Sequence, residues 1–236
     1  MSDKTGLKPN RAINLKHMKK FLLAGLFLAG TFALNAQDDN TTKAKTLLDE
    51  LSKKIKGYTS IQVEFSMNLK MQDGSVEDQK GKGTIKGEKY FVEIAGKEVR
   101  CDSKKVWTYD PDANECAVTC LDDGETDDSE DLLNPSKMFT FWEEGLKYTY
   151  EKESTDGGVK VDEIKLVPKD PKKSKFHTII LKINKEKKQI HSVTVKGKNG
   201  DTMTYKITKF TPNVEVKDSD FKFDKSKHPG VTMIDC

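Results

Sequence analysis

Four cysteines are the residues of this 236-residue chain most able to do chemistry, as disulfide partners, metal ligands or nucleophiles. Cys116 and Cys120 stand four residues apart in an apparent strand, so their α-carbons would lie about 13 Å apart, too far for a disulfide. Any disulfide should therefore involve Cys101 or Cys236. The C-x3-C spacing also lacks companion zinc ligands, so it predicts no metal site.

Sequence motifs that mark enzyme active sites are missing from the chain. We find no glycine-rich phosphate loop, no nucleophile elbow and no HExxH metal motif. Beyond residue 36 the histidines are scattered, and nothing in the sequence orients one against a cysteine, as Cys–His catalysis requires. They are His177, His191 and His228. We therefore expect no enzyme, no cofactor and no bound metal.

Alternation of apolar and polar residues is the strongest pattern, and the chemistry it favours is apolar binding. From Ile61 to Leu69 every second residue is apolar, which gives a strand with one apolar and one polar face. Many further strands follow, with few helices to cover them. A large sheet with one apolar face must either close on itself or cover that face with a bound molecule, so we expect binding of an apolar ligand.

The N-terminus has the layout of a secretory signal peptide. Met18-Lys19-Lys20 precedes the apolar stretch Phe21 to Leu34, and polarity changes abruptly after Ala36. We expect residues 1–36 to be removed and residues 37–236 to form one domain. That removal takes away six basic residues and one acid, so the net charge changes from +3 to −2. A nucleic-acid role loses its main electrostatic support, and export makes disulfides possible.

The elements expected after residue 36 are two helices and about eleven strands, joined mostly by hairpins. One helix follows a cap at Asn40 or Thr41 and ends at Gly57. The segment Phe221-Lys222-Phe223 is expected to start a last short strand. The other expected strands are 60–71, 83–86, 89–94, 99–102, 106–110, 115–121, 148–152, 161–167, 176–183, 190–196 and 202–210.

A second helix is expected from Pro135 to Glu144, with Asn134 as its N-cap. Its bulky stripe could be plain core packing or a lid over an apolar cavity, and the sequence leaves both open. The stripe consists of Met138, Phe139, Phe141 and Trp142. The acidic stretch Asp122 to Asp131, which precedes it, is either a solvated loop or a docking patch for a basic partner.

Several segments, taken in order, resemble the periplasmic outer-membrane lipoprotein carrier family (LolA-like). Each is weak alone, but the ordered set spans nearly the whole chain after residue 36. The segments are Phe65 after the first helix, Gly81-Lys82-Gly83, Asp102 to Pro111 with its Trp107-Thr108-Tyr109, Leu166-Val167-Pro168-Lys169, Phe221-Lys222-Phe223 and Pro229-Gly230-Val231.

This resemblance implies a mainly β fold with a few helices, in which a large antiparallel sheet curves into an unclosed β-barrel and the helices cover its mouth as a lid. It implies a monomeric periplasmic carrier, or chaperone, that binds the acyl chains of lipoproteins in a hydrophobic cavity and shuttles them from the inner to the outer membrane. The implied partners are acylated lipoproteins, an inner-membrane lipoprotein-releasing transporter, an outer-membrane acceptor and a transient membrane contact.

One departure from the family pattern concerns an Arg-Pro pair whose arginine helps to hold the lid closed. Here the region reads Lys86-Gly87-Glu88-Lys89-Tyr90, and Arg100, the single arginine after residue 36, does not match the motif. A lysine lacks the planar fork of a guanidinium. A related lipid or glycolipid carrier, a lipoprotein sensor of the same fold and, further off, a secreted enzyme therefore stay as alternatives.

The residues expected to line or border the cavity come from strands of shared apolar parity and from the expected lid. They are Phe65, Met67, Leu69, Tyr90, Val92, Trp107, Tyr109, Met138, Phe141 and Trp142.

Overall fold

The computed structural model describes residues 31–121 and 134–236, and describes side chains from residue 39 onward. Most of the expected signal peptide and the acidic stretch Asp122 to Asp131 lie outside these residues. The chain divides into Met1–Asp39 and a compact unit, Asn40–Cys236, which holds the strands and the core. None of the described helices combines the length and the apolar character needed to cross a membrane.

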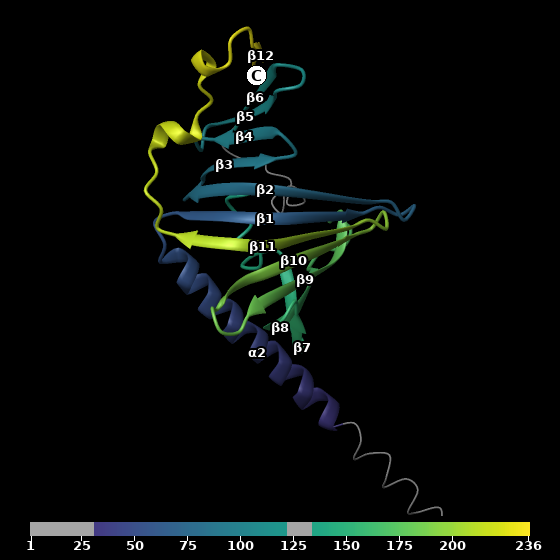
Figure 1. The fold of residues 1–236 in the computed structure, drawn as a ribbon. Coiled ribbons are helices and arrows are strands. Elements are labelled where there is room, and N and C mark those ends of the chain that lie inside the picture. Colours follow the sequence, from purple (N-terminus) through teal and green to yellow (C-terminus); the bar gives the residue numbers. More distant parts are fainter. Residues whose placement is uncertain (1–30, 122–133) are drawn as a thin grey trace, which may run out of the picture. The chain divides into compact units, whose positions relative to one another are not determined.

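The described residues of this unit contain twelve strands, eleven of which overlap the expected segments (Figure 1). Their bounds are β1 Ile61–Lys70, β2 Val76–Lys86, β3 Lys89–Ile94, β4 Lys97–Cys101, β5 Lys105–Asp110, β6 Glu115–Cys120, β7 Leu146–Asp156, β8 Val159–Pro168, β9 Phe176–Asn184, β10 Gln189–Gly197, β11 Thr202–Pro212 and β12 Thr232–Ile234.

All twelve strands form one sheet in the order β12-β6-β5-β4-β3-β2-β1-β11-β10-β9-β8-β7. Neighbours are antiparallel except β12, which runs parallel to β6, so the sheet is mixed. A single seam, β1 against β11, joins the strands of the first half to those of the second (Figure 1). The sheet is unclosed, as expected, because its end strands β12 and β7 do not pair. It is not strongly curled, however, so the expected barrel is corrected to an open, mixed sheet.

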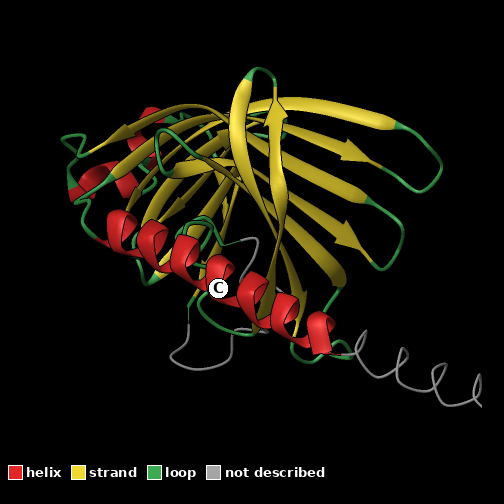
Figure 2. Ribbon diagram, turned by 90° about the horizontal axis from the view of Figure 1, so that it is seen from below, coloured by secondary structure: helices red, strands yellow, loops and turns green. Residues whose placement is uncertain are grey.

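One α-helix, α2 (Thr31–Lys56), is present in the described residues, and from Asn40 onward it lies across one face of the sheet (Figure 2). It ends before Gly57 as expected, but it begins at Thr31, ahead of the expected cap. Ala44, Leu48 and Leu51 are buried against the sheet, because their spacing places them on one side of the helix. We call this covered side of the sheet the inner face.

The main hydrophobic core lies on the inner face, where α2, Phe139 and Trp142 pack against strands from both halves of the sheet. In β9 the buried residues alternate with less buried outward ones, as the period of a strand requires. The most deeply buried are Ile164, Leu166, Ile179, Leu181 and Ile183, all at 0–2% exposure.

Two expected elements take a different form. The segment expected as a helix from Pro135 to Glu144 is a series of turns with hydrogen bonds from residue i+3 to residue i, such as Thr140 N–H to the Lys137 carbonyl. Phe221 ends a short 3₁₀ helix, Asp218–Phe221, instead of starting a strand, and the last strand comes later, at Thr232–Ile234. The expected pair of covering helices is thus one α-helix plus a turn segment.

The C-terminal segment returns across the opposite, outer face of β4 to β6. Phe223, Val231 and Met233 form a second apolar cluster there with Tyr109 and Cys116. A disulfide between Cys120 and Cys236 fixes the end of this segment to β6. The prediction that Cys116 and Cys120 do not pair is therefore confirmed, as is the involvement of Cys236, whereas Cys101 and Cys116 are buried free thiols.

Candidate functional site

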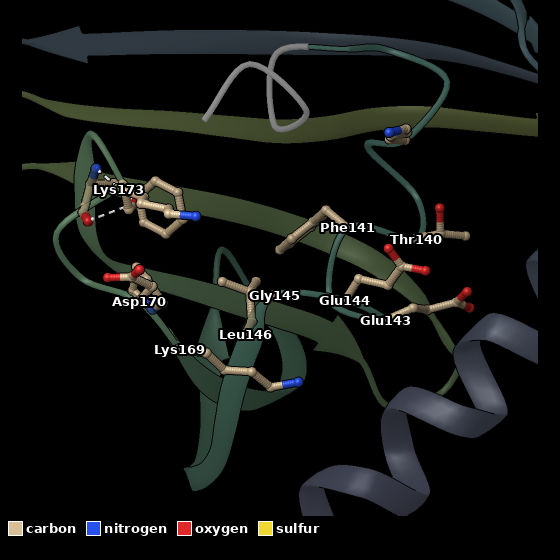
Figure 3. A pocket seen from close by; sticks show the side chains of 13 residues that line it. Thr140, Phe141, Glu143, Glu144, Gly145, Leu146, Lys169, Asp170 and Lys173 are labelled. Carbon is tan, nitrogen blue, oxygen red and sulfur yellow. Dashed lines mark hydrogen bonds between the residues drawn. The ribbon is translucent and has the colours of Figure 1, made fainter. Parts of the chain in front are cut away.

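A cavity of about 520 Å³ opens where the turn segment 134–145 meets the start of β7 and the loop between β8 and β9 (Figure 3). Apolar side chains come from three separate elements: Phe141 from the turn segment, Leu146 from β7 and Phe176 from β9. Leu146 and Phe176 also belong to the main core. The cavity is therefore an open extension of that core and can accept an apolar group without breaking a strand.

Charged side chains surround the mouth of this cavity. Figure 3 shows Glu143 and Glu144 on the turn segment and Lys169, Asp170 and Lys173 on the β8–β9 loop. The mouth is polar and the interior apolar, an arrangement suited to a ligand with a charged end and a hydrocarbon end.

The turn segment is held to α2 by two polar contacts. The indole Nε1 of Trp142 donates a hydrogen bond of 2.9 Å to the hydroxyl of Ser52, and Lys56 forms an ion pair of 2.7 Å with Glu143. Burial raises the pKa of Glu143, but hydrogen bonds from Lys56 and Ser52 outweigh it and hold the pKa below its usual value. Glu143 therefore stays ionised at neutral pH and keeps the ion pair.

The predicted site residues of the turn segment divide between cavity and core. Phe141 lines the cavity, and Met138 is half-buried against the core. Trp142, in contrast, is 2% exposed and packs edge-on against Phe141 with ring centroids 5.2 Å apart. Trp142 thus supports Phe141 from behind.

The predicted site residues of β1 share the inner face, as their alternation indicated. Phe65, Met67 and Leu69 are half-buried, whereas Ile61 and Val63 of the same strand are buried in the main core. The inner face of β1 therefore becomes more accessible from Phe65 onward.

The ring of Phe65 lies over Gly81 of β2. A β-carbon placed on Gly81 would come within 2.5 Å of the Phe65 Cζ, so only glycine leaves room for the ring. On its other side Phe65 packs edge-on against Tyr205 of β11, with centroids 6.1 Å apart. A second depression, of about 550 Å³, lies beside Phe65 and Ile94 among charged residues of β1 to β3.

Tyr90 and Val92 of β3 also lie on the inner face, but they differ in accessibility. Val92 is half-buried, whereas Tyr90 is 6% exposed and contacts the Cys101 thiol. Burial, with the neighbouring thiol, raises the pKa of Tyr90 well above its usual value. A ligand on this face could reach Val92 directly and Tyr90 only after local movement.

Trp107 and Tyr109 lie on the outer face, away from the other predicted site residues. In the β4–β5 register Val99 opposes Thr108, so the inner-face residues of β5 are Val106 and Thr108. Trp107 and Tyr109 instead pack with the C-terminal cluster. The other eight predicted residues lie on the inner face or in the turn segment, but they do not line one cavity: Phe141 lines the first cavity and Phe65 the second depression.

Two segments contribute most of the cavity residues that the predicted site lacked. The turn segment adds Lys137, Thr140, Glu143, Glu144 and Gly145, and the end of β8 with the β8–β9 loop adds Pro168, Lys169, Asp170, Lys173 and Ser174. One signal for the second group was available, because Leu166-Val167-Pro168-Lys169 was among the segments that carried the family resemblance. Among the described residues, no group of three or more side chains is arranged to hold a metal ion.

Comparison with protein families gives a direct match. The model of the family described as "Outer membrane lipoprotein carrier protein LolA" matches residues 97–224, just over half of the chain. This chain belongs to the LolA family. The match begins at β4 and includes the Asp102 to Pro111, Leu166 to Lys169 and Phe221 to Phe223 segments. A search of curated proteins found no match.

Several solved structures are similar to this chain, and the first of the three described here supports the fold. An uncharacterized conserved protein from Thermus thermophilus is similar at 12% identity, with a TM-score of 0.53, covering 81% of this chain and 98% of its own. A putative outer membrane lipoprotein-sorting protein domain from Vibrio parahaemolyticus, at 11% identity, has a TM-score of 0.44 over 77% of this chain and 97% of its own. A LolA superfamily protein from Nitrosomonas europaea, at 11% identity, has a TM-score of 0.41 over 77% and 98%.

Proposed function

We propose that this protein is a periplasmic carrier that binds the acyl chains of lipoproteins and moves them from the inner to the outer membrane. The observation that carries the proposal is the family match, and the apolar cavity with a charged mouth supports it. Export through the expected signal peptide fits the Cys120–Cys236 disulfide, because disulfides persist in oxidising compartments.

Accessible apolar side chains of the inner face form the proposed acyl-binding surface. A ligand gains about 0.8 kcal/mol for each buried CH2 group, so acyl chains favour half-buried side chains that they can finish covering. We assign first contact to Phe65, Met67, Leu69, Val92, Met138 and Phe141. Tyr90 and Trp142 lie beneath them and support their positions.

The turn segment 134–145 acts as the movable cover in this proposal. Its anchors on α2 are one neutral hydrogen bond, from Trp142 to Ser52, and one ion pair, from Lys56 to Glu143. Hydrogen bonds and surface ion pairs of these kinds each contribute about 1 kcal/mol or less. When the turn segment opens, Phe141 would lose apolar contacts with the protein and gain similar contacts with an acyl chain. The open and closed states of the segment would therefore lie close in free energy.

Lipid that co-purifies with the protein provides the first test. Purified protein, made with its own leader, should yield acylated peptides or lipids on extraction and mass spectrometry. Recovery of a diacylated or triacylated lipoprotein would support lipoprotein as cargo. Recovery of phospholipid or glycolipid alone would instead support a related lipid or glycolipid carrier. Recovery of no lipid, together with no binding of added lipopeptide, would contradict the proposal.

Substitution on the inner face gives the second test. Phe65→Glu should abolish binding of a fluorescent lipopeptide, because an unpaired charge in an apolar site costs several kcal/mol. Val76→Glu is the matched control, since Val76 is already 53% exposed. A folded Phe65→Glu protein with wild-type affinity would exclude Phe65 from the site.

A further inference from the structure

Eight exposed lysines gather at one end of strands β7 to β10. This is the end at which β7 begins, β8 ends, β9 begins and β10 ends, so hairpin pairing places the eight near one another. They are Lys147, Lys165, Lys169, Lys172, Lys173, Lys175, Lys196 and Lys198. We call this group the lysine end.

Ion pairs distinguish the lysine end from the opposite end of the same strands. Among the described residues, none of the eight lysines lies within ion-pair distance of a carboxylate, whereas at the opposite end Lys182 pairs with Asp156 at 2.8 Å and Lys206 with Asp156 at 3.0 Å. Lys185 and Lys188 there are paired as well, whereas Lys152, Lys160 and Lys187 have no ion pair with a described residue. Within residues 31–121 and 134–236, therefore, no carboxylate neutralises the lysine end, although residues 37–236 together carry a net charge of −2.

Among the residues that the structure describes, the acids near the lysine end are few, and some are already engaged. Glu143 pairs with Lys56, and Asp170 caps its own loop through the Lys172 N–H. Asp201 accepts hydrogen bonds from Gln72 N–H and Asn199. Glu144 is the remaining carboxylate at the cavity mouth.

The β8–β9 loop connects the lysine end to the apolar cavity. Lys169 and Lys173 line the mouth of that cavity, beside Phe141 and Leu146 (Figure 3). Lys198 hydrogen-bonds the Pro171 carbonyl and its own backbone N–H meets the Lys175 carbonyl, so the β10–β11 turn braces the loop. The cationic group therefore has a defined place next to the cavity opening.

We propose that the lysine end docks the protein onto a membrane surface of anionic phospholipids, with the cavity mouth turned toward the bilayer. The inference rests on the proposed function, because it supplies the geometry by which acyl chains enter or leave the cavity. Clusters of four to eight basic residues bind anionic lipid surfaces, each lysine contributing on its own. An acidic protein would match the charge, but a bilayer also presents hydrocarbon to the adjacent apolar opening.

Vesicle flotation of the full protein tests the proposal. The probes are vesicles of phosphatidylcholine alone and of phosphatidylcholine mixed with phosphatidylglycerol. Wild-type protein should bind only the mixed vesicles, and salt should weaken binding. Lys172→Gln/Lys175→Gln/Lys196→Gln, which leaves the cavity lining untouched, should lower the affinity roughly a hundredfold.

A matched variant controls for net charge. Lys104→Gln/Lys105→Gln/Lys225→Gln removes the same charge from exposed lysines of the β4–β5 turn and the C-terminal segment, and should leave vesicle affinity unchanged. Equal loss in both variants, or no loss in the first, would overturn the proposal. Equal binding of the wild-type protein to neutral and mixed vesicles would also overturn it. Binding to neither kind of vesicle would overturn it as well, and would indicate that the lysine end binds an acidic protein or is simply solvated.

Binding of a fluorescent fatty acid in solution separates this inference from the proposed function. The Lys172/Lys175/Lys196 variant should retain that binding, since none of these three lysines lines the cavity. Vesicle docking without fatty-acid binding in the wild type would remove the carrier function and leave the docking surface. Fatty-acid binding without docking would remove the docking surface alone.

Discussion

Gly81 is the residue at which the packing of Phe65 can be tested without touching Phe65. A β-carbon at Gly81 would meet the Phe65 ring at 2.5 Å and the Glu93 carbonyl oxygen at 2.7 Å. Gly81→Ala should therefore destabilise the protein by about 1–3 kcal/mol, the usual range for overpacking. Urea unfolding measures the change.

Gly83, two residues further along β2, provides the control. Its added β-carbon would meet Val92 Cγ2 at 3.5 Å, an ordinary contact. Gly83→Ala should change stability far less than Gly81→Ala, and equal effects would refute the close approach of the Phe65 ring.

Buried thiols give a second prediction at this scale. Cys101 and Cys116 are 2% and 0% exposed, and burial raises the pKa of both thiols. Little thiolate forms at neutral pH, so iodoacetamide should react with neither cysteine in the folded protein and with both in urea. Mass spectrometry of labelled peptides measures this, and rapid labelling of the native protein would contradict the assignment.

The sequence predicts which side chains of β1 point to the inner face, but it does not do so for β5. In β1 polar residues separate Phe65, Met67 and Leu69, so one face is clearly apolar. In β5 Val106 faces the inner side and Trp107 the outer, and both sides are apolar because the C-terminal segment covers the outer one. That cover comes from residues more than a hundred positions away, and a local pattern contains no information about it.

At the scale of elements, the Cys120–Cys236 disulfide holds the short strand β12 against β6. Its sequence separation is 116 residues, so opening it should cost about 2–4 kcal/mol of stability. Cys236→Ser should lower the unfolding midpoint and increase hydrogen exchange in β6 and β12. Unchanged exchange in both strands would show that β12 is held without the disulfide.

Residues of β7, β9, β10 and β11 form a charged cluster around His191, and this cluster should make the stability of the protein depend on pH. Burial lowers the pKa of His191 below 6.5, with Lys206 and Lys182 adding to the effect and Asp156, 3.7 Å away, opposing it. The unfolded chain then binds more protons than the folded one as pH falls below 6.5. Stability should therefore fall between about pH 7 and pH 5.

Asp156 does not produce this fall, because hydrogen bonds from Lys182 and Lys206 hold its pKa far below its usual value and it stays ionised. His191→Gln should flatten the dependence of unfolding free energy on pH, whereas His177→Gln, at an exposed position, should not. If the unfolding free energy of His191→Gln still falls with pH as in the wild type, other titrating groups cause the dependence.

The turn segment 134–145 marks the limit of predicting elements from the sequence. The cap Asn134, Pro135 and Gly145 are sound helix signals, and the Asn134 side chain does accept a hydrogen bond from Ser136 N–H. The interior is short and aromatic, however, and gains little from helix propensity. The path of the segment is decided by tertiary contacts of Phe139 and Trp142 with the core, which the local sequence does not reveal.

At the scale of the whole molecule, β7 is an edge strand that could recruit a second copy. Its outward residues include the exposed Glu151, Lys152 and Glu153, and charged side chains on an edge oppose strand addition. The protein should be a monomer by light scattering at micromolar concentration. Glu151→Val/Glu153→Val should shift it toward dimers or aggregates, and a dimeric wild type would contradict this account of the edge.

The seam between β1 and β11 bears on how the chain reaches its native state. Ile61 pairs with Pro212 and Lys70 with Thr202, whereas β1 to β6 and β7 to β11 each connect through neighbouring hairpins. Local hairpins close quickly, and pairings between distant segments close slowly. Each half can therefore assemble early, while β1 keeps an open edge until β11 has been synthesised. The interval before the two halves join is the period in which this chain most needs protection from aggregation.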